Sequence, residues 1–145
     1  MYWAGERLGR ARIRRAYAYQ DLHGQLGMLP LGTDFPVEGT APLRTYYAAV
    51  VRKDTEGYPD QGFQMDEALD RLSALKGMTG WAALACFREH DLGQVAPGYR
   101  ADFTVLDRNV LTVEAEDLLG TQVLQTWIGG ERVFERKRGS AVPLP

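Results

Sequence analysis

The spacing of apolar residues changes once along the chain, and this change constrains the fold more than any other feature. Up to about residue 90 the apolar residues recur every three or four positions, and beyond residue 97 they alternate with a period of two. The first spacing indicates amphipathic helices and the second indicates β-strands. The sequence therefore predicts an α/β chain in the order helix, short strand, three helices and a small antiparallel β unit.

The expected helices cover about residues 6–25, 40–51, 65–76 and 80–89. Thr40 is the expected N-cap of the second helix, and Pro42 suits its first turn, where a missing N–H costs nothing. The residues expected to face the core of the second and third helices are Leu43, Tyr46, Tyr47, Val50, Val51, Leu69, Leu72 and Leu75.

A short apolar run, Met28 to Leu31, lies between the first two helices and is closed by Gly32-Thr33-Asp34. We interpret it as a brief buried strand that ends in a loop. Pro30 removes one donor from any ladder that this strand could form.

The expected β unit is defined by two turn signals. Pro97-Gly98 predicts a type II turn ahead of a strand at 101–106, and Gly129-Gly130 predicts a tight hairpin. The hairpin strands are expected at 123–128 and 132–135, and residues after Lys137 are expected to form a tail.

Composition and charge argue against several classes of protein. The net charge of −2 is too small to indicate a nucleic-acid or membrane-surface partner. The single cysteine, Cys86, allows no intrachain disulfide and no thiolate metal cage. The apolar runs are shorter than a membrane span, and the N-terminus lacks a signal-like apolar core. A cytoplasmic protein is therefore expected.

Asp34 is the first candidate for a catalytic residue. A carboxylate at the C-terminal end of a buried strand occupies the position where α/β barrels place catalytic groups. The alternative is that Asp34 only turns the chain ahead of Pro36.

The histidines and the cysteine carry weaker signals. His23 is expected at a helix C-terminus, where a cationic imidazole suits the helix dipole. Cys86 and His90 are four residues apart on an expected helix, but two ligands are too few for a closed metal site, and packing is the simpler role of a buried cysteine. The cluster from Arg10 to Arg15 could contact phosphates, although a solvated helix face accounts better for it.

Several motifs occur in an order that resembles one known family. The most specific are Leu31-Gly32-Thr33-Asp34-Phe35-Pro36-Val37-Glu38, Leu92-Gly93-Gln94-Val95 with Pro97-Gly98, and Ala101-Asp102-Phe103-Thr104-Val105-Leu106-Asp107. Further matches are Arg7-Leu8-Gly9, Ala16-Tyr17, Pro42-Leu43, Ala48-Ala49-Val50, Arg52, Glu67-Ala68-Leu69, Thr79, Ala82-Ala83, Val123, Thr126, Gly130 and Val133. Together they resemble the C-terminal part of the amidohydrolase superfamily, in the amidohydrolase 3 branch that includes N-substituted formamide deformylases.

The resemblance implies a fold and a reaction. Residues 1–90 would be the last strand and helices of a metal-dependent-hydrolase (β/α)8 barrel, residues 91–137 strands of the composite β-sandwich beside it, and residues 138–145 a tail. Such enzymes hydrolyse C–N bonds other than peptide bonds in small amide-like molecules, using water activated by a divalent metal, commonly zinc. Asp34 matches the residue that binds the metal and acts as general base.

The remaining family ligands have no counterpart here. They are a His-x-His after strand one, a lysine or acidic residue after strand four and two later histidines, and neither His23 nor His90 matches them. One carboxylate cannot hold a catalytic zinc, which needs about three protein ligands. We therefore expect the chain alone to be inactive, to hold no tightly bound metal, and to be a fragment of such an enzyme.

Two other expectations stay open. The chain could be a non-catalytic interaction or structural module derived from the end of the barrel. A homo-oligomer is expected in either case, because the strand at Met28 to Leu31 would lack its neighbours and an open strand edge invites pairing with another copy.

Overall fold

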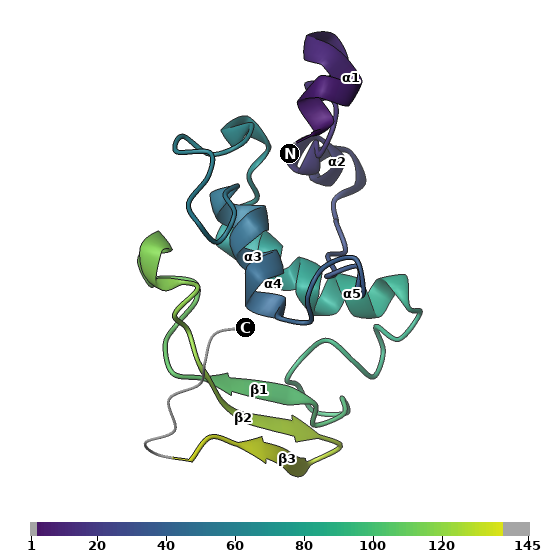
Figure 1. Ribbon diagram of the computed structural model, residues 1–145. Coiled ribbons are helices and arrows are strands. Elements are labelled where there is room, and N and C mark those ends of the chain that lie inside the picture. Colours follow the sequence, from purple (N-terminus) through teal and green to yellow (C-terminus); the bar gives the residue numbers. More distant parts are fainter. Residues whose placement is uncertain (1–2, 138–145) are drawn as a thin grey trace.

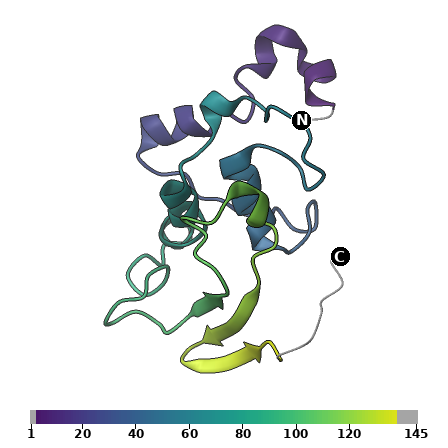
Figure 2. The same ribbon diagram turned by 90° about the vertical axis from the view of Figure 1, so that its left-hand side faces the viewer.

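The computed structural model describes residues 3–137. Its elements are α1 (Ala4–Ile13), α2 (Tyr19–Leu26), α3 (Pro42–Val51), η1 (Met65–Glu67), α4 (Arg71–Met78), α5 (Gly80–Ala85), β1 (Phe103–Leu106), η2 (Ala115–Asp117), β2 (Val123–Ile128) and β3 (Glu131–Glu135). The helices are followed by one small sheet, with β1 nearest the helices and β3 farthest from them (Figures 1 and 2). The expected change from helices to an antiparallel β unit is confirmed. The expected tail at 138–145 lies outside the described residues.

The single helix expected at 6–25 is wrong, because two helices, α1 and α2, occupy this region. Tyr17 interrupts the helical path with a φ of 58°, and its carbonyl accepts a hydrogen bond from Nη2 of Arg52 at 3.0 Å. A tertiary contact thus uses a backbone group that a continuous helix would have bonded internally. Gly27 is the C-cap of α2, and its φ of 71° is the left-handed conformation typical of a glycine that follows a helix.

The strand expected at Met28 to Leu31 is also wrong, because no strand is assigned there. The segment instead packs against α4, where the amide of Leu31 donates to the carbonyl of Gly77 at 2.9 Å. Gly77 permits this approach, since a Cβ at that position would lie 2.8 Å from the Leu29 carbonyl oxygen. A strand needs a neighbouring strand to complete its ladder, and no such neighbour lies beside this segment in the described chain.

The second helix agrees with its prediction to within about two residues. α3 begins at Pro42 with Ala41 rather than Thr40 as its N-cap. Tyr46 and Tyr47 are buried as expected, and the other members of the predicted stripe are partly buried against the core. Arg52 is the C-cap of α3 and has a left-handed conformation with φ of 59°.

The third and fourth helices differ from their predictions. The region 65–76 holds the short turn η1 and then α4, whose N-cap is Asp70. Leu69 is buried as expected, but Leu72 is 50% exposed, because the core-facing residues of α4 are Ser73, Ala74 and Gly77. α5 ends at Ala85, four residues short of the predicted end.

The sheet has the order β1-β2-β3, and both pairs are antiparallel. The turn at Pro97-Gly98 is confirmed, since Gly98 has a φ of 91° and the Tyr99 amide donates to the Ala96 carbonyl. Gly129 and Gly130 both have positive φ, of 59° and 83°, which is the conformation that a two-residue type I′ hairpin requires. The register of β2 against β3 shifts between Thr126 and Trp127, so β3 carries a bulge.

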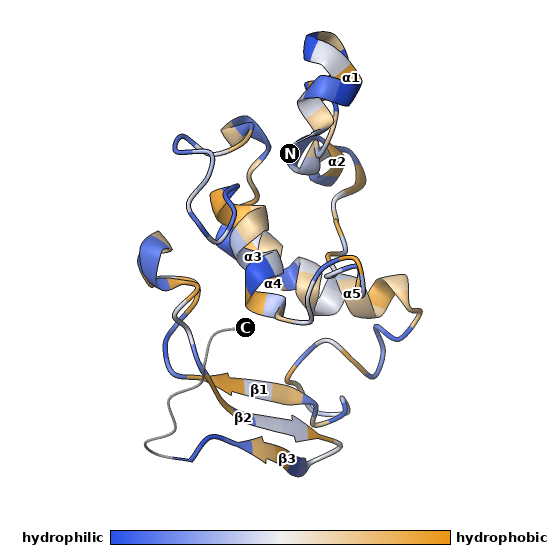
Figure 3. Ribbon diagram, viewed as in Figure 1, coloured by the Kyte–Doolittle hydropathy of each residue, from blue (hydrophilic) through white to orange (hydrophobic). Residues whose placement is uncertain are grey.

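One hydrophobic cluster joins the helices to the connection between β1 and β2. Its largest fully buried side chains are Tyr46 of α3, Leu69, which precedes the N-cap of α4, and Leu118, which follows η2. Figure 3 shows apolar residues gathered on α3 and α5, whereas α1 is largely polar. None of the helices within residues 3–137 is long and apolar enough to cross a membrane.

Candidate functional site

Asp34 lies in a turn directly after the extended segment that packs on α4. Its carbonyl accepts a hydrogen bond from the Val37 amide at 2.8 Å, and its own φ is 55°. Aspartate tolerates this left-handed conformation better than most residues. The Asp34 residue is exposed, so its carboxylate is available to solvent.

Asp34 lies on the wall of a cavity of about 720 Å³. The segment 31–39 forms one side of this cavity and α3 forms another, while Tyr17, Tyr19 and Phe63 contribute an aromatic part of the wall. Charges of both signs line the cavity, namely Asp34, Glu38 and Asp54 with Arg44, Arg52 and Lys53. The cavity therefore combines apolar surface with polar groups, which is the character of a small-molecule site.

Arg52 holds three separate segments together at the edge of this cavity. The residue is only 5% exposed, and its guanidinium donates to the carbonyls of Phe63 at 2.9 Å and Tyr17 at 3.0 Å. Its charge also lies over the rings of Tyr19 and Phe63, at 4.9 and 5.5 Å from their centroids. Burial lowers the pKa of Arg52, although the charges of Tyr19 and Glu67 act in the opposite direction. Sequence analysis did not identify this residue as an anchor, because its contacts are long-range in sequence.

The carboxylates around the cavity do not make a metal site by themselves. Asp54 is engaged in its own loop, where Oδ1 accepts the amides of Glu56 and Tyr58, both at 2.8 Å. Within residues 3–137, no group of three His, Cys, Asp or Glu side chains is placed to hold a metal ion. Asp34 is thus a single carboxylate, whereas catalytic zinc needs about three protein ligands.

The structure separates the two histidines and the cysteine. His23 lies in the last turn of α2, as predicted, with its ring 5.1 Å from that of Trp81 and its Nδ1 buried without a hydrogen-bond partner. Cys86 is the C-cap of α5 and is exposed, so the expectation of a buried cysteine is wrong. His90 lies beyond the end of α5, which means that Cys86 and His90 do not share a helix face.

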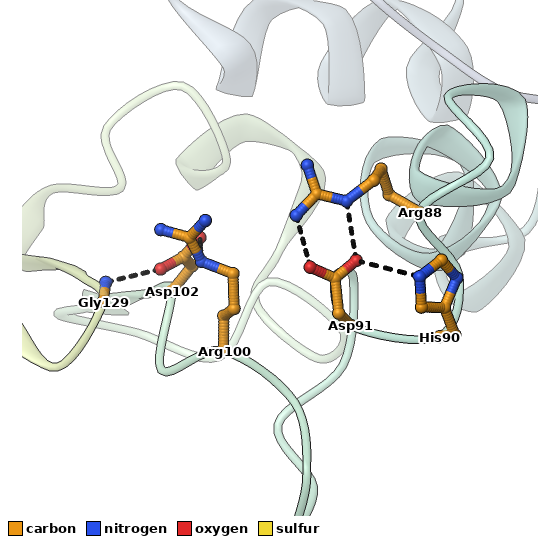
Figure 4. Close-up of polar contacts among 6 residues, drawn as sticks. All are labelled: Arg88, His90, Asp91, Arg100, Asp102 and Gly129. Atoms are coloured by element: carbon orange, nitrogen blue, oxygen red, sulfur yellow. Dashed lines mark hydrogen bonds and ion pairs between the residues drawn. The ribbon is translucent and has the colours of Figure 1, made fainter.

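A polar network that sequence analysis missed holds the connection between α5 and β1 (Figure 4). The guanidinium of Arg88 contacts both carboxylate oxygens of Asp91, and these hydrogen bonds lower the pKa of that carboxyl. Nε2 of His90 lies 3.9 Å from Asp91. Farther along, Asp102 accepts the amide of Gly129 at 2.6 Å and so ties the start of β1 to the hairpin turn.

Comparison with known proteins identifies a single family. The model of the amidohydrolase family matches residues 1–134. The chain is 31% identical over 134 residues to YtcJ of Bacillus subtilis strain 168, a protein provisionally described as an amidohydrolase, and this match covers 92% of the chain and 25% of YtcJ. It is 32% identical over 130 residues to the protein LONG AFTER FAR-RED 3 of Arabidopsis thaliana. This match covers 89% of the chain and 22% of that protein.

A third relative is the N-substituted formamide deformylase of Arthrobacter pascens, which is 32% identical to this chain over 106 residues. This match covers 73% of the chain and 19% of the deformylase. The chain thus spans a quarter or less of the length of these relatives. No solved structure matches it significantly.

Proposed function

The chain belongs to the amidohydrolase family, and from this premise we propose that it forms the C-terminal portion of a hydrolase that cleaves C–N bonds other than peptide bonds in small amide-like molecules. Two similarities support the proposal, the family match over residues 1–134 and the relative named as an N-substituted formamide deformylase. In this proposal residues 1–90 are the end of the barrel, residues 91–137 belong to the composite sandwich, and the enzyme is cytoplasmic.

The observation that carries the proposal is the position of Asp34. It is exposed on the wall of the 720 Å³ cavity, at the end of a segment whose other side packs on α4. A free carboxylate beside a cavity can accept a proton from an attacking water, which is the work of a general base. We therefore propose Asp34 as the catalytic carboxylate of the complete enzyme.

The same carboxylate is the one group of this chain that we propose as a ligand of a divalent metal, zinc by the family resemblance. When bound, such a metal makes a water molecule acidic enough to attack a carbonyl carbon near neutral pH. The described residues do not complete its coordination, so the other ligands would come from outside this chain. We accordingly propose that the chain alone is inactive.

The test uses a complete family enzyme that carries this segment. Asp34→Asn is expected to lower turnover by about a hundredfold or more, because it removes a ligand and a base together. Asp60→Asn, which makes the same substitution at an exposed aspartate outside the lining of the cavity, is the matched control and should stay close to the parent. Turnover is measured on a panel of formamide, amide, cyclic imide and urea-like substrates, together with the metal content of each variant.

Circular dichroism shows whether both variants keep their fold. Near-normal turnover of a folded Asp34→Asn variant, on every substrate that the parent cleaves, would remove Asp34 from the mechanism.

A further inference from the structure

Arg52 is a buried charge whose hydrogen bonds join two segments that lie far apart in the sequence. Its side chain donates from Nε to the Phe63 carbonyl at 2.9 Å and from Nη2 to the Tyr17 carbonyl at 3.0 Å. Its own carbonyl accepts the Phe63 amide at 2.8 Å, so these two residues are joined through the backbone and the side chain together. The guanidinium is planar and carries several donors in fixed directions, which lets one side chain bond both carbonyls.

The same guanidinium lies within a stack of aromatic rings. Its charge is 4.9 Å from the centroid of the Tyr19 ring and 5.5 Å from that of the Phe63 ring, and the Tyr17 ring meets the Phe63 ring edge-on at 5.8 Å. These three rings form the aromatic wall of the cavity that Asp34 also lines. Each of these contacts joins two residues of the described chain, so the position of the aromatic wall is set by contacts that this segment makes with itself.

The backbone around the stack has an uncommon conformation. Three of the five non-glycine residues with positive φ among residues 3–137 are Tyr17, Asp34 and Arg52, with φ of 58°, 55° and 59°, and all three line the cavity. Positive φ costs energy for a residue with a side chain and persists only where surrounding contacts enforce it. Arg52 bonds the Tyr17 carbonyl, and Gln64 bonds the Ile13 carbonyl at 2.6 Å in the same connection between α1 and α2. Backbone strain of this kind is concentrated at sites that hold a ligand.

From these contacts we infer that Arg52 is a positioning residue of the proposed enzyme, which holds the aromatic wall in place to receive the apolar part of the substrate beside Asp34. The inference rests on the proposed function for the reacting group, and it adds the residues that bind the rest of the molecule. Aromatic side chains supply large apolar contact surface in small-molecule sites. Arg52 acts through the three rings, so it should govern affinity for the apolar group, whereas Asp34 should govern turnover.

The test uses a complete family enzyme that carries this segment, with 2-butanone and 2-heptanone as probes. Both ketones have a carbonyl and no C–N bond, so they bind without being hydrolysed, and they differ only in three methylene groups. Ligand-detected NMR titration gives the two dissociation constants. The parent should bind 2-heptanone about tenfold more tightly than 2-butanone, because the additional methylene groups lie against the aromatic wall.

Arg52→Lys keeps the charge but loses the planar guanidinium, and it should lower this preference about threefold or more. Arg132→Lys makes the same substitution at an exposed arginine outside the lining of the cavity, and it should keep the preference of the parent. A role of Arg52 in stability alone would not change the preference, because unfolding removes the binding site for both ketones alike. On amides that the parent cleaves, Arg52→Lys should raise KM and keep kcat within about threefold of the parent.

Tyr19→Ala is the second variant, because it removes one ring of the aromatic wall without changing either hydrogen bond of the Arg52 side chain. It should also lower the preference about threefold or more, and it decides the question if Arg52→Lys does not fold. A parent whose preference depends on both residues but which cleaves no amide would support this inference and contradict the proposed function. The inference is overturned if the parent binds both ketones equally, or if a folded Arg52→Lys or Tyr19→Ala variant keeps the preference of the parent.

Discussion

The hydroxyl of Tyr46 connects the helices to the segment between β1 and β2, and its removal should lower the free energy of unfolding by a small amount. Tyr46 is 1% exposed, and its hydroxyl lies 3.1 Å from the carbonyl oxygen of Arg71 and 3.2 Å from that of Val110. Both carbonyls keep another partner without the hydroxyl. Nη1 of Arg71 donates to Val110 at 2.7 Å, and α-helical geometry pairs the Arg71 carbonyl with the amide four residues on.

Tyr46→Phe should therefore lower the free energy of unfolding by only about 1 kcal/mol. This is the net contribution of one hydrogen bond when its acceptors keep other partners after the donor is removed. Tyr46→Ala also removes a buried ring and leaves a cavity, which should cost about 4 kcal/mol. Urea unfolding followed by circular dichroism measures both values, with equal slopes showing that the unfolded state is unchanged. A loss above 3 kcal/mol for Tyr46→Phe, or below 1 kcal/mol for Tyr46→Ala, would refute this account of the contact.

The same residue predicts an alkaline pH dependence. Burial raises the pKa of Tyr46, and the nearby charge of Arg71 only partly opposes this. A tyrosine whose folded pKa is raised contributes stability that is full below its unfolded pKa of about 10 and is lost as the pH rises through the folded pKa. The parent should lose stability above about pH 10, and Tyr46→Phe should lack this component of the loss.

Two further predictions concern α4 and the core beside it. Asp70→Ala should lower the free energy of unfolding by about 1 kcal/mol, because the Asp70 carboxylate caps α4 by accepting the Ser73 amide at 2.9 Å. The hydrogen bonds from Ser73 lower the pKa of Asp70, so the stability that this carboxylate contributes is present above about pH 4 and is lost as the pH falls through the folded pKa. If Asp70→Ala loses no more unfolding free energy than Asp70→Asn, the capping role is contradicted. Leu69→Ala should lower the free energy of unfolding by about 3 kcal/mol, because Leu69 is only 2% exposed. Leu72 is 50% exposed, so Leu72→Ala should lower it by less than about 0.5 kcal/mol in the same unfolding assay.

Local signals in the sequence predicted the elements whose geometry is itself local. The hairpin at Gly129-Gly130 and the turn at Pro97-Gly98 follow from the positive φ that glycine supplies, and both are confirmed. α3 was predictable because Pro42 and a regular apolar stripe define it without reference to other segments.

The errors arise where tertiary contacts determine the backbone. The break at Tyr17 depends on a hydrogen bond from Arg52, which is 35 residues away. Leu72 was assigned to the core by its spacing, but the contact with the extended segment before Asp34 places the small residue Gly77 on the buried face of α4 instead. Helical periodicity states which residues share a face, but only the packing partner decides which face is buried.

β3 shows the same limit. In a regular strand Arg132 and Glu135, which are three residues apart, would lie on opposite faces. The shift of register at Trp127 brings both side chains to one face, where Nη1 of Arg132 lies 2.9 Å from Oε1 of Glu135. A bulge is a property of two paired strands, so this contact becomes predictable only when the pairing of β2 with β3 is known.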